Sequence, residues 1–253
     1  NKEKKGYFEM ATGTGKTITA IYAMKQVLNE DPRVGVIIAV PTKTLVEQWK
    51  NELIKEGEIE TKIHLCSGEH KDWKDLFRRY ALIESKENRF FVFTYSSLRN
   101  ETIQTLIDNS IRPFILICDE MHHVGAPKYS RCLNSKIKIR IGLSATPIRS
   151  HDIEGTTKLE SYFGKEPLLL FEISRALHEI DPKTGKTYLC PYYYDFKTVC
   201  LNEDEHKKFR ELSKRIAIQK RKPSHKLDEN DQPDKLRALL ISTAEEKIPV
   251  LSE

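Results

Sequence analysis

The sequence predicts an α/β fold: a doubly wound, mostly parallel β-sheet with helices on both faces. Strand-like and helix-like segments alternate along residues 1–165, which is the pattern of parallel strands joined by right-handed helical crossovers. Two strand-like runs, Val34–Val40 and Phe114–Cys118, are almost wholly apolar, as is typical of strands buried on both faces. A loop rich in glycine and threonine, residues 11–17, joins the first strand-like run to the first helix-like segment.

The other elements of this fold follow from local periodicity. The short apolar run Gly6–Phe8 predicts the first strand, and branched or aromatic runs predict others over Lys62–Cys66, Phe90–Thr94 and Lys138–Leu143. Helical spacing of apolar residues predicts helices over Gly15–Asn29, Lys43–Lys55, Lys71–Ser85 and Ser97–Asn109. Segments with proline at residues 31–32 and 110–113 are expected to end the helices that precede them.

The pattern changes after Gly164. Phe171–Ile180 has the spacing of a short amphipathic helix, and Asp181–Lys186 is typical of a turn that joins this helix to a strand. Three tyrosines follow at residues 192–194. Because neighbouring residues of a strand point to opposite faces, we favour core packing for these tyrosines over stacking on nucleic-acid bases.

The C-terminal part is rich in charge. Asn202–Lys222 predicts a helix with apolar residues along one stripe, Phe209, Leu212 and Ile216, and a connecting role is favoured over the tracking of phosphates. Residues 221–233 indicate a flexible linker, and residues 234–253 a last helix. We therefore divide the chain into a nucleotide-binding-type domain at 1–165, a connecting segment at 166–222, and a linker with a helix at 223–253.

Composition sets wide bounds. The 253 residues, 39% of them hydrophobic, suffice for one large α/β domain with appended helices. A net charge of +5 is compatible with nucleic-acid binding without arguing for it. The five cysteines form no Cys-x-x-Cys pair, so we expect reduced thiols in an intracellular, cytoplasmic protein, without zinc or disulfides. No signal peptide or membrane-length apolar run occurs, and no membrane partner is expected.

Residues 11–17, Ala-Thr-Gly-Thr-Gly-Lys-Thr, have the composition of a phosphate-binding loop. Glycines let successive backbone N–H groups point at a phosphate, the next helix adds the positive end of its dipole, and Lys16 adds a full charge. Thr17 is placed to bind magnesium. The general pattern has a glycine five residues before Gly15, where this chain has Met10, so an ordinary turn before a helix remains the alternative.

A second candidate site lies at the end of the apolar run Phe114–Cys118, where Asp119 and Glu120 follow. Ligands of open α/β sheets bind at the carboxyl ends of the strands. Asp119 is therefore positioned to hold magnesium through its water shell, and Glu120 to accept a proton from an attacking water. An exposed acidic turn is the alternative, but it leaves the upstream phosphate loop unexplained.

Five segments of the chain have the order and spacing found in superfamily 2 helicases and translocases, which the chain resembles over residues 5–165. They are residues 11–17, 40–49 (Val-Pro-Thr-Lys-Thr-Leu-Val-Glu-Gln-Trp), 94–98 (Thr-Tyr-Ser-Ser-Leu), 119–122 (Asp-Glu-Met-His) and 142–147 (Gly-Leu-Ser-Ala-Thr-Pro). The acidic motif resembles the DEAH form, and the second histidine, His123, makes it similar to XPB-like and restriction-type translocases of bacteria and phage. The resemblance implies a RecA-like P-loop NTPase domain that uses ATP and Mg²⁺.

The resemblance also implies roles for single residues. The nucleotide is expected at Thr12, Gly13, Thr14, Gly15, Lys16, Thr17 and His122, and magnesium at Thr17 and Asp119. Lys16, Asp119 and Glu120 form the expected catalytic set. Ser144 and Thr146 are expected to report the nucleotide state to the nucleic-acid groove. Nucleic acid is expected at Thr42, Lys43, Thr94 and Tyr95, where hydroxyls, N–H groups and a helix dipole can meet phosphates, although Lys43 has a solvated surface lysine as its alternative.

We expect the chain to be part of a longer motor. Family members carry an upstream glutamine motif that recognises adenine and a second RecA-like domain that supplies arginine fingers, and neither pattern occurs in this sequence. The resulting prediction is the ATP-binding motor domain of a DNA helicase or translocase, with duplex DNA the favoured partner. A phosphate-loop kinase and a passive nucleic-acid-binding module are the alternatives.

Overall fold

The structure, a computed structural model, describes residues 3–57, 59, 62–70, 72–83, 87–149, 152–191, 198–221, 233–245 and 247. Its contacts divide the chain into two compact units, residues 1–191 and 192–253. The boundary between the units falls inside the segment 166–222 that the sequence indicates as a connection.

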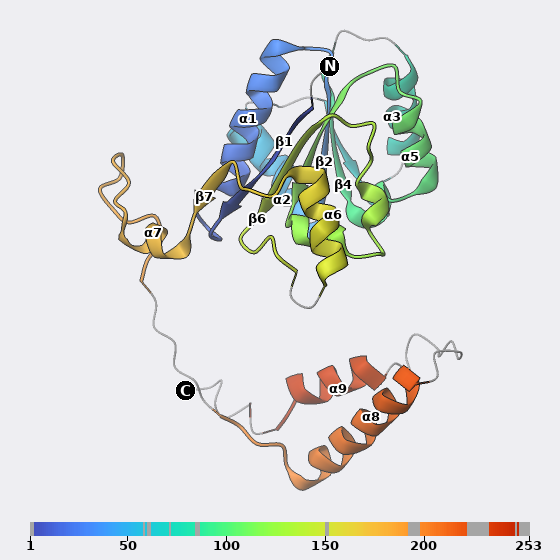
Figure 1. The fold of residues 1–253 in the computed structure, drawn as a ribbon, viewed down its shortest axis with the longest axis vertical. Coiled ribbons are helices and arrows are strands. Elements are labelled where there is room, and N and C mark those ends of the chain that lie inside the picture. The colour runs from blue at the N-terminus through green and yellow to red at the C-terminus, as the bar shows by residue number, and fades with distance from the viewer. Residues whose placement is uncertain are drawn as a thin grey trace. The chain divides into compact units, whose positions relative to one another are not determined.

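The first unit is built on a seven-stranded sheet in which every strand pairing is parallel (Figure 1). The strand order is β3-β4-β2-β5-β6-β1-β7. The strands are β1 (Lys4–Met10), β2 (Gly35–Val40), β3 (Ile63–Cys66), β4 (Phe90–Thr94), β5 (Phe114–Asp119), β6 (Ile139–Ser144) and β7 (Leu169–Phe171). Because all the strands run in one direction, their carboxyl ends meet at one edge of the sheet.

Helices cover both faces of this sheet (Figure 1). On one face lie α1 (Lys16–Glu30) and α2 (Lys43–Lys55), whose buried residues join the strands in one apolar cluster. On the other face lie α3 (Trp73–Leu82), α4 (Tyr95–Leu98), α5 (Glu101–Asp108) and α6 (Ile153–Phe163). The predicted doubly wound α/β fold is confirmed.

The central strands belong to both apolar clusters at once. Along β2, Val36 and Ile38 pack towards α1 and α2, whereas Ile37 and Ala39 pack towards the helices of the opposite face. All six residues of β2 and of β5 are buried. Burial on both faces explains why these strands are continuous apolar runs rather than alternating ones.

The single helix predicted over Ser97–Asn109 is two helices, and capping explains the break. The hydroxyl of Thr94 accepts a hydrogen bond from the Ser97 N–H and caps α4. The side chain of Asn100 accepts one from the Thr102 N–H and caps α5. Because Asn is among the strongest N-cap residues, a new helix begins there although the apolar spacing continues.

The segment after α6 adds a strand that the periodicity did not predict. β7 pairs with β1 at the sheet edge and is only three residues long. The short helix predicted after it is present as α7 (Ile173–His178). The predicted turn at residues 181–186 is closed by a hydrogen bond from the Asp181 N–H to the Lys186 carbonyl. The three tyrosines lie outside the described residues, and their packing in the core stays a prediction.

The second unit contains α8 (Glu203–Arg221) and α9 (Pro233–Ser242). The apolar stripe of α8 is partly covered, because Ile216 is buried and Arg237 of α9 lies over the Phe209 ring. The last predicted helix, over residues 234–253, is present as α9 up to Ser242, and residues 248–253 lie outside the described part of the chain. Of the linker predicted over residues 221–233, the first residue belongs to α8 and the last to α9, and residues 222–232 lie outside the described part of the chain. None of the helices that the structure describes is both long enough and apolar enough to cross a membrane.

Candidate functional site

The predicted phosphate loop leaves the carboxyl end of β1 and enters α1. Its two glycines have left-handed backbone angles, with φ of 84° at Gly13 and 90° at Gly15. Residues with a Cβ adopt this region at a cost, so both positions favour glycine. The ammonium of Lys16 is buried, and it donates to the carbonyls of Met10 at 3.1 Å and Ala11 at 3.3 Å. The loop therefore folds around its own lysine.

The N-terminus of α1 is suited to an anion. Its N-cap residue, Gly15, offers no side-chain hydrogen bond, and the first turn contains no acidic residue. The first N–H groups of a helix have no partner within the helix, and they carry the positive end of its dipole. Thr12 and Gly13 are exposed, whereas Thr14 and Thr17 are partly buried. The predicted nucleotide-binding residues of this loop thus surround one helix N-terminus.

The acidic pair lies at the same edge of the sheet, at the end of β5. The carboxylate of Asp119 is buried; its Oδ2 accepts the indole N–H of Trp49 at 2.8 Å and its Oδ1 accepts the Glu120 N–H at 3.0 Å. Burial raises the pKa of Asp119, and the Trp49 hydrogen bond and the charge of Lys16 act against that rise. The phosphate-loop lysine therefore acts on Asp119, although the two are 103 residues apart in the numbering.

Glu120 occupies a strained backbone position, with φ of 49° in the left-handed region. Its carboxylate lies 3.4 Å from Nδ1 of His122. The same Nδ1 is 3.1 Å from the hydroxyl of Ser144 at the end of β6. Burial, together with the neighbouring charges of His123 and Arg149, lowers the pKa of His122, which favours the neutral imidazole. The Ser144 hydroxyl also accepts the Thr146 N–H at 3.1 Å, which extends the chain of contacts from Glu120 to Thr146.

The predicted nucleic-acid residues fall into two groups. Thr42 and Lys43 are exposed at the N-terminus of α2, where Thr42 caps the helix and Lys43 pairs with Glu69 at 2.6 Å. Thr94 is only 7% exposed, and its hydroxyl is already used as the N-cap of α4. Thr42 and Thr94 thus lie at the starts of two helices, and their predicted contact with nucleic acid stays a prediction.

The predicted contact of Tyr95 with nucleic acid is wrong for its side chain. Tyr95 is completely buried in the core, and its hydroxyl donates to the backbone carbonyl of Asp119. The aromatic ring packs at 5.8 Å from the ring of Tyr129. The Tyr95 side chain therefore points inward, towards the acidic pair. Its buried hydroxyl finds there the hydrogen-bond partner that a buried phenol needs.

The comparisons with known proteins agree with this arrangement of motifs. The family described as type III restriction enzyme, res subunit (ResIII) matches residues 1–149. The chain belongs to the ResIII family.

Three curated relatives share parts of this ResIII chain. Putative helicase 22 of Sulfolobus islandicus filamentous virus is 31% identical over 153 residues, which cover 57% of this chain and 24% of the viral protein. The putative DNA 3'-5' helicase Rad25 of Haloarcula marismortui is 28% identical over 59% of this chain and 21% of its own. The DNA 3'-5' translocase XPB2 of Sulfurisphaera tokodaii is 28% identical over 85% of this chain and 41% of its own. The ResIII chain spans less than half the length of each relative.

Solved structures show the fold of the ResIII chain. The ATP-dependent Type ISP restriction-modification enzyme LlaBIII bound to DNA has a TM-score of 0.52 at 20% identity, over 68% of this chain and 14% of that one. The Hef helicase domain of Pyrococcus furiosus has a TM-score of 0.51 at 18% identity, over 83% and 42%. Together with the family match and the helicase and translocase relatives, this fold identifies the chain as a RecA-like first domain of the superfamily 2 helicase and translocase class, near XPB-like and restriction-type members.

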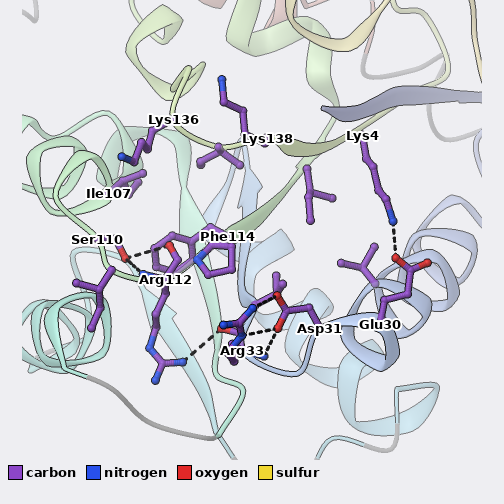
Figure 2. Close-up of a pocket in the computed structure, with 16 residues that line it drawn as sticks. Lys4, Glu30, Asp31, Arg33, Ile107, Ser110, Arg112, Phe114, Lys136 and Lys138 are labelled. Atoms are coloured by element: carbon purple, nitrogen blue, oxygen red, sulfur yellow. Dashed lines mark hydrogen bonds and ion pairs between the residues drawn. The ribbon is translucent and has the colours of Figure 1, made fainter. Parts of the chain in front are cut away.

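A pocket of the ResIII domain is lined by none of these motif residues, and Figure 2 shows the side chains that line it. It has a volume of about 730 Å³ and is lined at the amino ends of the strands by residues such as Lys4, Val34 and Phe114. Four of its charged side chains form pairs within the pocket, Lys4 with Glu30 and Arg33 with Asp31. The size of a pocket is a poorer guide to the site in this domain than the positions of the titratable groups.

The donor set of the ResIII domain fits magnesium held mainly by phosphate and water. Among the described residues, no group of three or more His, Cys, Asp and Glu side chains could hold a metal ion by itself. Magnesium typically uses one or two carboxylates together with waters and substrate phosphates, and Asp119 with the hydroxyl of Thr17 can supply such a partial set. Thr17 lies in the first turn of α1, directly after the phosphate-loop lysine.

Sequence reasoning did not find two supporting residues. Trp49 holds Asp119, and Arg149 donates to the backbone carbonyl of His122 and pairs with Asp152 at 2.7 Å. One signal for Trp49 was present: an indole on the buried stripe of a helix requires an acceptor for its N–H. No comparable signal exists for Arg149, because its contact depends on how the loop after β6 folds back.

Proposed function

We propose that this chain is the ATP-binding motor domain of a superfamily 2 DNA helicase or translocase, which couples ATP hydrolysis to movement along nucleic acid. The observation that carries the proposal is that the phosphate-loop lysine, Lys16, and the buried carboxylate of Asp119 lie at the same edge of the sheet, where the charge of Lys16 lowers the pKa of Asp119. A cation on a phosphate-binding loop beside a buried carboxylate is the arrangement that a bound Mg²⁺–triphosphate requires.

In this proposal the residues act mainly by position. The N–H groups of residues 12–17 and the ammonium of Lys16 bind the β- and γ-phosphates, so that Lys16 exchanges its two loop carbonyls for phosphate oxygens. Glu120 orients the attacking water and accepts its proton. Mg²⁺, held by Asp119 and Thr17, would neutralise charge on the transferring phosphoryl group. The His122 contacts to Glu120 and Ser144 would carry the state of the nucleotide towards Thr146.

The nucleic-acid partner is proposed from exposed groups and from the relatives. Thr42 and Lys43 present a helix N-terminus and a charge, which suit a phosphate backbone without regard to base sequence. The names of the relatives describe a DNA 3'-5' translocase and DNA 3'-5' helicases, and LlaBIII was solved bound to DNA. Duplex DNA is the partner that we infer, with a second RecA-like domain closing over the nucleotide.

The test is ATP turnover with single-stranded DNA, duplex DNA and RNA as competing stimulants, measured in the longest native form of the protein. We expect duplex DNA to raise the turnover number most. Lys16→Ala should abolish nucleotide use. Glu120→Gln should retain ATP binding and lose roughly 10²- to 10⁴-fold in turnover, the usual contribution of a general base. Equal turnover by Glu120→Gln and the parent would refute the role of Glu120, and turnover indifferent to every nucleic acid would favour a phosphate-loop kinase.

The isolated chain is expected to bind nucleotide weakly and to hydrolyse it slowly. Arginine fingers contribute roughly 10³-fold or more to turnover in phosphoryl-transfer enzymes, and the sequence contains no arginine-finger motif of the second-domain type. Adding a second RecA-like domain, as a fusion or in the native protein, should therefore raise turnover by at least that order. A chain of 253 residues that already turned over at the rate of a full motor would contradict this expectation.

A further inference from the structure

The Asp119 carboxylate is held by one protein donor on each oxygen. Oδ2 accepts the indole N–H of Trp49, and Oδ1 accepts the N–H of Glu120. These two bonds fix the rotation of the carboxylate and leave each oxygen with a further lone pair. A carboxylate fixed in this way meets a metal ion or its water shell without first having to be ordered.

The indole that makes the first of these bonds is buried in the core. Trp49 is 1% exposed and lies on the buried stripe of α2 with Val46 and Leu53. It packs in the apolar cluster on the α1 and α2 side of the sheet. The position of its N–H is therefore set by the position of the whole helix.

Helix α2 also carries the exposed groups proposed to meet nucleic acid. Thr42 is its N-cap and Lys43 its first residue, about two turns before Trp49. One rigid helix thus has a surface end suited to phosphate and a buried indole bonded to the metal carboxylate. A shift of α2 along its axis must move the donor relative to Asp119.

A second contact reaches Asp119 from the opposite face of the sheet. The hydroxyl of Tyr95 donates to the Asp119 carbonyl, and Tyr95 belongs to the cluster under α3, α5 and α6. The backbone of Asp119 is consequently fixed independently of α2. The Trp49 bond is the contact that can change when α2 moves.

We propose that Trp49 is a positioning residue that orients the Asp119 carboxylate for Mg²⁺ and ties the metal site to helix α2. The inference deepens the proposed function and rests on it, because it assumes that Asp119 serves Mg²⁺–ATP.

The experiment compares the two tryptophans of the chain. Trp49→Phe keeps a buried aromatic ring and removes the N–H donor. Trp73→Phe is the matched control, since Trp73 is also buried and donates its indole N–H, but to the Ser67 carbonyl at 3.2 Å. The measurement is binding of the fluorescent nucleotide mant-ATP by the 253-residue chain at increasing Mg²⁺, with thermal melting followed in parallel.

We expect Trp49→Phe to raise the Mg²⁺ concentration for half-maximal binding by roughly 10- to 100-fold, the usual effect of losing a residue that supports a metal ligand. Trp73→Phe should leave this concentration unchanged even though it also lowers the melting temperature. Equal Mg²⁺ requirements for both variants and the parent would overturn the positioning role. Lys16→Ala separates the two proposals: if it binds mant-ATP as the parent does, the nucleotide site itself is wrong.

A second measurement keeps the inference testable if Trp49→Phe does not fold. The Trp73→Phe chain has Trp49 as its single tryptophan, so its emission reports directly on the bond to Asp119. Addition of ATP with Mg²⁺ should change this emission, whereas ATP with a chelator should not, and Asp119→Asn should abolish the change. An emission that is the same with and without Mg²⁺ would overturn the inference.

Discussion

Buried polar atoms at the end of β5 illustrate how single residues decide the site. Tyr95 was expected on the nucleic-acid surface and instead supports the Asp119 backbone from within the core. The sequence motif marks the right segment, but the motif does not say which way a side chain points. A hydroxyl in a completely buried ring contributes through its hydrogen bond, and its loss leaves a buried acceptor without that donor.

Tyr95→Phe tests this reassignment. It should lower the free energy of unfolding by about 1 kcal/mol, the usual net value of one buried hydrogen bond. Its affinity for duplex DNA should equal that of the parent, because the side chain has no exposed surface. Urea denaturation and DNA titration give the two values. Unchanged stability together with lost DNA affinity would restore the direct contact.

His64 on the edge strand β3 gives the domain a pH dependence. Burial and the neighbouring Arg89 lower its pKa, and its Nε2 lies 3.2 Å from the Arg89 guanidinium, so Nε2 acts as an acceptor in the neutral ring. Above the unfolded pKa of about 6.5, neither state binds a proton. Below it the unfolded chain is protonated first, so stability falls as the pH drops towards the lowered native pKa.

The measurement is the melting temperature between pH 7.5 and pH 5. The parent should lose more stability over this range than His64→Gln, which keeps an acceptor without an imidazole that titrates. Parallel curves for the two proteins would show that His64 does not contribute to the pH dependence.

At the scale of elements, caps and packing set the boundaries of the helices. Thr42 closes the first turn of α2 by accepting the Leu45 N–H at 3.3 Å. Further along the same helix, the bond of Trp49 to Asp119 ties α2 to the end of β5. In the proposed function, capping and nucleic-acid binding would use the same hydroxyl and the same helix end.

Two substitutions at residue 42 separate these functions. Thr42→Ala should cost about 1 kcal/mol of stability through the lost cap. Thr42→Asp should retain the cap, since Asp is a strong N-cap residue, but should weaken DNA binding by placing a negative charge against phosphate. Chemical denaturation and DNA titration at two salt concentrations measure both effects. Retained DNA affinity in Thr42→Asp would exclude this helix end from the nucleic-acid site.

For the whole molecule, the two apolar clusters draw, among the residues that the structure describes, on positions before 192. The cores that order the strands and the candidate site thus belong to the first unit alone. A chain that ends at Pro191 should melt within about 2–4 °C of the 253-residue chain, the shift produced by about 1 kcal/mol in a domain of this size. Calorimetry is the measurement, and loss of a cooperative transition would show that the second unit is required for folding.

The sequence by itself determined the alternation of strands and helices, the parallel sheet and the two motifs at its carboxyl edge. These features depend on residues that are near one another in the chain. An apolar run such as Phe114–Cys118 is suited to a strand buried on both faces, and Gly13 and Gly15 allow the left-handed backbone angles of the phosphate loop. The strand β7 was not predicted from the sequence, because a run of three residues is too short to show a periodicity.

Only the tertiary structure decided which groups support the site. The bond of Trp49 to Asp119 joins residues 70 positions apart, and the bond of Tyr95 to the same residue arrives from the other face of the sheet. Such contacts depend on the order of the strands and on which face each helix covers. The spacing of residues along the chain predicts neither the strand order nor the face that a helix covers. Both are fixed only when the separate elements pack into one core.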